Sequence, residues 1–375
     1  MDLITDVGIL KYLQSKEATR AITEVEKLSG GTANFVWRAT VGTPSADIFD
    51  GAKTVIVKHA EGYFADCKII VDKIRMEYEN RVLSIVHQAA NDDEKIATDR
   101  VHVPRVFYFD TLNCVTVQED GGSAPHLKDY ISSLEQAPPK ELSTAIGSSL
   151  GEFVARLHLY GHRHREQLNR PDQMHSQVAL DLSRAVWFDD ILNALPRHDF
   201  ILDEDKAILS AAAAWGCQRL MTEPETLAHG DLWPGNILIK TNVNQQDQHQ
   251  LEQLCVIDWE WSRYAPAAMD LGQLMAESIT LDRYRHPCVE IQTSFLDSYC
   301  KAYKDRLNVV DLKTAAIHTG CHLVVWIPCR AWFPKAKTKD IISLGTEYMK
   351  HAWNENWDWF RKHSSYRVMV EALKL

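Results

Sequence analysis

The strongest constraint on this chain is a glycine- and proline-containing segment that runs directly into an apolar strand, His229-Gly230-Asp231-Leu232-Trp233-Pro234-Gly235-Asn236. Pro234 and Gly235 suit a tight loop, which the following strand would anchor. Asp231 could reach a hydroxyl group as a general base, and Asn236 could turn back onto a metal ion that holds phosphate groups. The segment therefore predicts a phosphoryl-transfer loop. An ordinary loop with a helix-capping aspartate is the alternative.

A second acidic element follows at the end of a predicted buried strand. Asp258 comes directly after the apolar run 254–257, 22 residues beyond Asn236. A hairpin would bring the two side chains together, and Mg²⁺ prefers such hard oxygen ligands, so we predict Asn236 and Asp258 as metal ligands. Glu260 would share the strand face of Asp258 if the strand continued. It would then hold a second metal ion or shape the acceptor site, and the alternative is an exposed turn carboxylate.

A lysine and a helical glutamate form the third candidate pair. Lys58 lies in the strand predicted over 53–60, and a helix is predicted over about 71–90. At ~100° per residue, Glu79 falls within the apolar stripe of that helix and Glu77 points to the opposite side. Because a buried carboxylate needs a partner, we predict a Lys58–Glu79 pair. A solvated charge at the strand edge is the alternative for Lys58.

A glycine turn joins the strands predicted over 23–28 and 35–41, with the sequence Ser29-Gly30-Gly31-Thr32-Ala33-Asn34. Glycines let backbone amides approach phosphates closely, although a plain hairpin loop fits the turn equally well. Because the turn precedes Lys58 by one strand, we predict a lid over a nucleotide, formed by Gly30, Gly31, Thr32 and Asn34. The end of the strand predicted over 114–119, at Glu119, would offer backbone groups to the base.

The order of predicted elements divides the chain near residue 120. Residues 1–120 form a small β-rich lobe with one helix, and helices dominate residues 121–375. A hairpin over 236–240 and 254–258 interrupts these helices. The polar stretch 162–175, rich in His and Arg, is predicted to be a mobile loop or an insertion. The chain is therefore of the α+β class, with a small antiparallel β lobe and a larger helical lobe.

Together these motifs resemble the aminoglycoside phosphotransferase and choline kinase superfamily over about residues 20–350. The strings 28–38, 151–158 and 257–272 are similar to methylthioribose kinases and to fungal small-molecule kinases, among them the 4-hydroxytryptamine kinases. The resemblance implies a protein-kinase-like two-lobed fold, ATP and Mg²⁺, and transfer of the γ-phosphoryl group to a hydroxyl of a small molecule. The implied roles are a base, Asp231; metal ligands, Asn236 and Asp258; a lysine on the α- and β-phosphates, Lys58; its orienting partner, Glu79; and a structural brace of the catalytic loop, Asp270.

Two rival classes are weighed against this function. A protein kinase is disfavoured because Gly230 stands where those enzymes usually carry Arg, and because no Ala-Pro-Glu segment follows Asp258. A non-catalytic nucleotide-binding or interaction protein on the same fold is the main alternative. A degenerate relative has no chemical need for a complete set of catalytic positions, so their presence argues against it.

The charge balance limits the partners of this chain. Its 51 Asp and Glu residues exceed its 41 Lys and Arg residues, which disfavours nucleic acid and anionic membranes as partners. No stretch approaches the roughly 18 apolar residues of a membrane span, and the N-terminus shows no secretory signal. The 8 cysteines are scattered, so free thiols and a cytoplasmic location are expected.

The acceptor is expected to be a small molecule with a hydroxyl group, and its identity stays open. Tryptophans beside carboxylates suit a cationic amine or an indole ring, with a role in the helical core as the alternative for each of Trp233, Trp259, Trp261, Trp326 and Trp332. Arg330 could instead face an anionic or sugar group. An amino-alcohol-like and a sugar-alcohol-like acceptor are therefore both retained as hypotheses.

Overall fold

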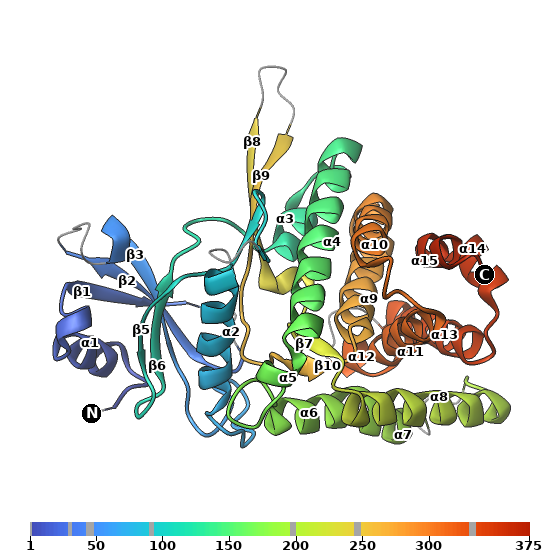
Figure 1. The fold of residues 1–375 in the computed structure, drawn as a ribbon, viewed down its shortest axis with the longest axis horizontal. Helices are drawn as coiled ribbons and strands as arrows, with labels where there is room; N and C mark the ends of the chain where they lie inside the picture. The colour runs from blue at the N-terminus through green and yellow to red at the C-terminus, as the bar shows by residue number, and fades with distance from the viewer. Residues whose placement is uncertain are drawn as a thin grey trace.

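The computed structural model describes residues 2–28, 32–42, 49–89, 94–195, 200–243, 249–329 and 335–375. Its N-terminal part is an antiparallel sheet with the strand order β1-β2-β3-β6-β5 (Figure 1). The strands of this sheet are β1 (Ile22–Lys27), β2 (Phe35–Val41), β3 (Thr54–His59), β5 (Val106–Asp110) and β6 (Val115–Glu119). The predicted strands agree with these bounds to within about one residue at each end.

Side-chain alternation decides which residues of this sheet face its apolar core and which face the other side. Trp37 and Ala39 of β2 and Val55 and Val57 of β3 are buried in one apolar cluster. Successive side chains of a strand point to opposite faces. Lys58 therefore projects from the other face of β3.

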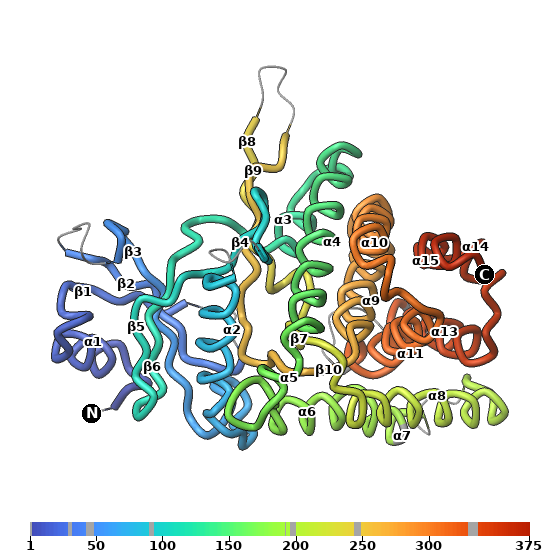
Figure 2. Tube along the Cα trace, viewed as in Figure 1, coloured from blue at the N-terminus to red at the C-terminus, as the bar shows by residue number. Residues whose placement is uncertain are grey.

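Two helices flank the sheet. Helix α1 (Asp6–Gln14) packs against β1 and contributes Ile9, Tyr12 and Leu13 to the cluster of the sheet. Helix α2 (Arg75–Ala89) lies between the sheet and the helical part of the molecule (Figure 2). The sequence analysis did not predict α1.

The helical part follows β6. Its longer helices are α4 (Lys140–Arg163), α8 (Asp203–Thr222), α9 (Ala268–Tyr284), α10 (Val289–Tyr303), α11 (Val309–Val324) and α13 (Lys335–Trp353). Its shorter helices are α3 (Leu127–Ser133), α5 (Arg165–Leu168), α6 (Gln177–Arg184), α7 (Asp190–Ala194), α12 (Trp326–Cys329), α14 (Trp357–His363) and α15 (Arg367–Leu373). Helix α10 packs along α4, and α11 packs against α9 and α13 (Figure 1).

Short strands interrupt these helices where the catalytic motifs lie. The predicted hairpin consists of β8 (Ile237–Val243) and β9 (His249–Val256), which pair antiparallel, with β4 (Val101–His102) parallel to β9. A second small sheet pairs β7 (Thr226–Ala228) with β10 (Arg263–Ala265). The two motif segments therefore each begin at a paired strand.

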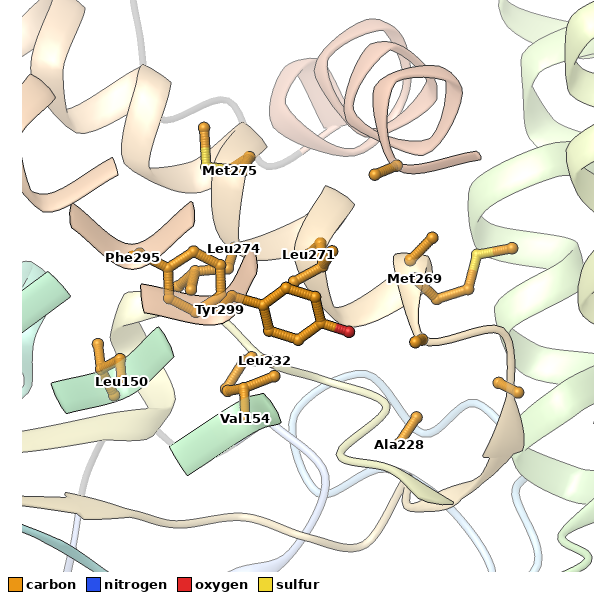
Figure 3. Packing of buried hydrophobic residues seen from close by; sticks show 14 of the residues in the cluster. Leu150, Val154, Ala228, Leu232, Met269, Leu271, Leu274, Met275, Phe295 and Tyr299 are labelled. Atoms are coloured by element: carbon orange, nitrogen blue, oxygen red, sulfur yellow. The ribbon is translucent and has the colours of Figure 1, made fainter. Parts of the chain in front are cut away.

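The apolar side chain of Leu232 fixes the segment 229–236 to the main core. Leu232, directly after Asp231, is buried in the large cluster of the helical part. Figure 3 shows Leu232 near Val154 of α4, Tyr299 of α10 and Leu271 of α9. Burial of a leucine stabilises a fold by about 1.5–3 kcal/mol, so this contact holds the polar loop at a defined place.

The stretch 162–175, predicted to be a mobile loop or an insertion, is only partly a loop. Helix α4 continues to Arg163, and α5 covers Arg165–Leu168. Leu168 and Met174 are buried in the main core and anchor this otherwise polar stretch. That the stretch is an insertion stays a prediction.

The structure is of the α+β class, as predicted. We propose a boundary near residue 120, since β6 ends at Glu119 and α3 begins at Leu127. Within the described ranges, no helix combines the length and the apolar character needed to cross a membrane. The cysteines whose side chains the structure describes are free thiols.

Candidate active site

A pocket of about 570 Å³ lies between the sheet and the base of the β8–β9 hairpin. Its walls come from the glycine turn, from β2, β3 and β6, from the connection 120–126, and from the two motif segments that end in Asn236 and Asp258. Sites for small ligands in proteins commonly have a volume of about 300–1,000 Å³. The pocket is therefore large enough for a nucleotide.

Lys58 is held between two carboxylates at the inner end of this pocket. Its Nζ atom lies 2.7 Å from Oε1 of Glu79 and 2.8 Å from Oδ1 of Asp258. Burial opposes a charge on Lys58, but the two carboxylates outweigh it and hold the pKa of Lys58 above its ordinary value. Lys58 is therefore a fixed cation, and the solvated strand-edge alternative is wrong because the side chain is buried.

The helical wheel distinguished the two glutamates of α2 correctly. Glu79 is fully buried, whereas the side chain of Glu77 is 38% exposed and pairs with Arg81 at 3.7 Å. We expect Glu79→Gln to lower the free energy of unfolding by about 1–3 kcal/mol, because it weakens a buried contact to a charged group. Glu77→Gln should change it by less than about 0.5 kcal/mol.

Denaturant unfolding measures the stability of both variants, and a turnover assay measures their activity. Turnover should fall in Glu79→Gln and stay near the wild-type value in Glu77→Gln. Equal behaviour of the two variants would show that the Lys58–Glu79 contact is not needed by the enzyme.

Asp231 is oriented by hydrogen bonds on both carboxylate oxygens. Nε2 of Gln273, from α9, donates to Oδ1 at 2.6 Å, and Nδ2 of Asn236 donates to Oδ2 at 2.9 Å. Burial and the nearby charge of Asp258 raise the pKa of Asp231 to about 6. The carboxylate is therefore held in one orientation with a pKa close to neutrality, which suits a general base.

Gly230 stands at this point because no side chain fits there. Its φ angle is +85°, and a Cβ atom would lie 2.1 Å from the carbonyl oxygen of Trp261. The backbone N–H groups of His229 and Gly230 donate to Asp270 at 2.8 and 2.9 Å, and His158 contacts the same carboxylate at 3.1 Å. Asp270 thus braces the loop 229–236, as predicted.

Asn236 and Asp258 meet across the base of the hairpin. The N–H of Ile257 donates to the carbonyl of Asn236 at 2.9 Å, and both Asn236 and Asp258 line the pocket. Strand β9 has already ended at Val256, and Asp258 adopts a left-handed conformation with φ +66°. This turn directs Asp258 toward Lys58.

Glu260 therefore does not share a strand face with Asp258, and the argument from strand continuation is wrong. Glu260 is 1% exposed, so the exposed-turn alternative is wrong as well. Its Oε2 atom accepts hydrogen bonds from Nε of Arg75 at 2.8 Å and from Nδ2 of Asn34 at 3.0 Å. Burial and the charge of Asp258 raise the pKa of Glu260 to about 8.

Sequence reasoning missed Arg75 and Gln273. Arg75 precedes Glu79 by one helical turn and thus shares its buried face, a signal that could have been used. Gln273 lies 42 residues from Asp231, and no local pattern connects the two residues.

The other predicted nucleotide contacts are placed as follows. Gly30 and Gly31 lie outside the described residues. Thr32 and Glu119 line the pocket, and the Glu119 carboxylate accepts the backbone N–H of Arg105 at 3.2 Å. Asn34 is 6% exposed and contacts Glu260 and Arg75.

The tryptophans near the motifs differ in their environments. Trp259 is fully buried, and its ring lies 4.3 Å from that of His229, so the core alternative is right for it. Trp261 is largely buried against Phe64. Trp233 lines the pocket, with Nζ of Lys128 5.0 Å from its ring. Trp332 and Arg330 lie outside the described residues.

The fold and the arrangement of this site define a kinase-like phosphotransferase. Choline kinase from Cryptosporidium parvum superposes on the structure with a TM-score of 0.52 at 12% identity, covering 94% of this chain and 97% of that chain. This likeness shows the protein-kinase-like fold.

The chain belongs to the phosphotransferase enzyme family (APH), whose model matches residues 51–312. It is 29% identical to a 4-hydroxytryptamine kinase of Psilocybe cyanescens over 95% of both chains. It is 23% identical to a methylthioribose kinase of Bacillus cereus over 73% of this chain and 65% of that protein. The chain is thus a phosphotransferase of a family of small-molecule kinases, with an alcohol group as acceptor.

Proposed function

We propose that this enzyme transfers the γ-phosphoryl group of ATP to a hydroxyl group of a small amino- or sugar-alcohol-like acceptor, with Mg²⁺ as cofactor and Asp231 as base. The observation that carries the proposal is the orientation of the Asp231 carboxylate. Gln273 and Asn236 hold it beside a pocket that also contains Lys58 and Asp258. A cytoplasmic location, as expected for a chain with free thiols, accompanies this proposal.

The pocket supports ATP as the phosphoryl donor. Lys58 would neutralise charge on the α- and β-phosphates, and Thr32, with the glycine turn around it, would cover them. Glu119 lies at the opposite end of the pocket, where the backbone of β6 ends and can bind the base. Asp231 would accept the proton of the acceptor hydroxyl while the hydroxyl oxygen attacks the γ-phosphorus and ADP leaves.

The residues at the inner end of the pocket fit a divalent cation. Asp258 and Glu260 line the pocket, and Glu79 and Asp231 lie just behind it; among the described residues here, these four carboxylates outnumber the cations Lys58 and Arg75. Within the same residues, no cluster of His, Cys, Asp or Glu forms a full metal cage. Mg²⁺ needs only one or two carboxylates together with phosphate oxygens of the nucleotide. Asp258 would supply a carboxylate oxygen and Asn236 an amide oxygen, with Glu260 nearby. When bound, Mg²⁺ would neutralise charge that develops on the phosphates.

Two buried residues beyond Gln273 favour an acceptor that carries an amine. Glu277 follows Gln273 by one turn of α9 and is 4% exposed. Its Oε1 atom lies 2.9 Å from Nε2 of His322 of α11. A carboxylate about 6 Å along the helix from the residue that orients the base would attract a cationic group on the acceptor.

A panel of acceptors tests the proposed function. We expect ADP release and a phosphorylated product with at least one of 4-hydroxytryptamine, methylthioribose, choline, ethanolamine, homoserine and an aminoglycoside. Product mass identifies the acceptor, and amine-bearing molecules should react faster than methylthioribose. A peptide should not react, because the structure supports a small acceptor. Nucleotide binding without transfer across the panel would favour the non-catalytic alternative.

A further inference from the structure

The guanidinium group of Arg75 forms a hydrogen-bonded junction in the buried part of this site. Nε donates to Oε2 of Glu260 at 2.8 Å. Nη2 donates to the side chain of Asn34 at 3.0 Å and to the carbonyl of Ala33 at 3.2 Å. Nη1 donates to the carbonyls of Glu61 and Asp72 at 3.2 and 3.0 Å. An arginine has five N–H donors in a fixed plane, and this one uses each of them.

These contacts join segments that are far apart in the chain. Asn34 and Ala33 belong to the glycine turn, and Glu260 belongs to the segment that follows β9. Arg75 stands at the start of α2 and is 1% exposed. The junction therefore fixes the cover of the pocket and the Asp258–Glu260 segment to the same helix.

Helix α2 is connected to the Asp258–Glu260 segment through a second set of contacts. Glu79, one turn after Arg75, binds Lys58, which in turn binds Asp258. Arg75 acts on Glu260 and Lys58 acts on Asp258, so both carboxylates of the motif are oriented by cations that α2 positions. Asn34 adds a second donor to Oε2 of Glu260.

The two oxygens of Glu260 differ in their hydrogen bonding. Oε2 is fully engaged by Arg75 and Asn34, whereas Oε1 is buried without a hydrogen-bond partner. Glu260 is part of the pocket wall. A buried carboxylate oxygen without a partner is costly, and a metal ion with its bound waters would satisfy it.

We propose that Arg75 is a positioning residue for Mg·ATP: it orients Glu260 so that Oε1 is available to the metal, and it ties this carboxylate to the glycine turn through Asn34. Hydrogen-bonding partners that orient metal ligands commonly change metal affinity by about 10- to 100-fold when they are replaced. This inference rests on the proposed function, since it requires Mg·ATP to bind in this pocket.

The test compares Arg75→Lys with Arg81→Lys. Lysine keeps the positive charge but cannot span the partners of a planar guanidinium. Arg81 is a matched control on the same helix, because it pairs with the partly exposed Glu77 outside the pocket. Calorimetric titration with ATP at several Mg²⁺ concentrations, and with EDTA, measures binding without relying on turnover.

We expect Arg75→Lys to weaken Mg·ATP binding by about 10- to 100-fold, to shift the Mg²⁺ requirement upward and to leave metal-free ATP binding within about twofold of the wild type. Arg81→Lys should bind like the wild type. Asn34→Ala keeps the ion pair between Arg75 and Glu260, and should also weaken Mg·ATP binding. Because the two residues act through one carboxylate, the double variant should lose less than the product of the single losses.

Four outcomes would overturn the inference. Equal Mg²⁺ dependence in Arg75→Lys and Arg81→Lys would remove Arg75 from the metal site. Multiplicative losses in the double variant would show that Arg75 and Asn34 act independently. If Arg75→Lys does not fold, wild-type Mg·ATP affinity in Asn34→Ala would contradict the proposed link. If the wild-type protein does not bind Mg·ATP, both the proposed function and this inference fail. The other outcomes leave Mg·ATP binding by the wild type intact and overturn the inference alone.

Discussion

Asp231→Asn should lower the turnover number by about 10²–10⁴-fold, the range expected for the loss of a general base. Asparagine has nearly the same shape, and its carbonyl can still accept the hydrogen bond from Gln273. It cannot accept the proton of the acceptor hydroxyl. Affinity for Mg·ATP should stay nearly unchanged, because Asp231 is proposed to act on the acceptor hydroxyl and is not among the described residues that line the nucleotide pocket.

Steady-state kinetics with the best acceptor of the panel, together with calorimetric titration of Mg·ATP, checks this result. Asp297→Asn on α10 is the matched control, since Asp297 forms a surface ion pair with Lys301. It should keep wild-type kinetics. Full activity in Asp231→Asn would exclude Asp231 as the base, and loss of nucleotide binding would move its role to the nucleotide site.

Asp258→Asn should remove most of the Mg²⁺ dependence of ATP affinity and lower turnover by at least about a hundredfold. A bound metal contributes several kcal/mol of transition-state stabilisation, and each 1.36 kcal/mol corresponds to about a factor of ten in rate. Asparagine is the right replacement here, because the φ angle of +66° at Asp258 is one that Asn tolerates better than Ala. The amide oxygen can still accept a hydrogen bond from Lys58.

Titration of Mg²⁺ at fixed ATP, followed by calorimetry, measures this effect. Asp50→Asn is the control: Asp50 also has a positive φ, +50°, and it forms an exposed ion pair with Arg105. Its Mg²⁺ dependence should match that of the wild type. If Asp258→Asn keeps a normal Mg²⁺ response, Asp258 is not a metal ligand and the charge excess in the pocket has another explanation.

Much of the candidate site could be predicted from local sequence patterns, because the spacing within one strand, helix or loop decides where several of its side chains point. The predicted Lys58–Glu79 pair is present in the structure at 2.7 Å. The helical period separated Glu79 from Glu77. Asp231 and Asn236 were predicted to lie in one tight loop, and the structure adds a hydrogen bond of 2.9 Å between them that was not predicted.

Predictions from strand periodicity were wrong where a strand ended earlier than expected. The position of Glu260 was predicted from a strand that stops at Val256, and Asp258 adopts a left-handed conformation that a continuing strand would not have. The polar stretch 162–175 was interpreted from composition alone, although it contains Leu168 and Met174, which are buried in the main core. In both cases the deciding factor was a contact with another segment.

The amino-acid sequence by itself determined the class of fold and the order of the motifs, and it led to the candidate site residues, since each depends on neighbours within a few positions. Only the tertiary structure decided that Arg75 holds Glu260 across 185 positions and that Gln273 holds Asp231 across 42. It also showed that Gly230 lies too close to Trp261 to carry a side chain. The physical reason is that buried polar groups must find partners wherever packing places them, and packing joins segments whose separation in the sequence carries no periodic signal.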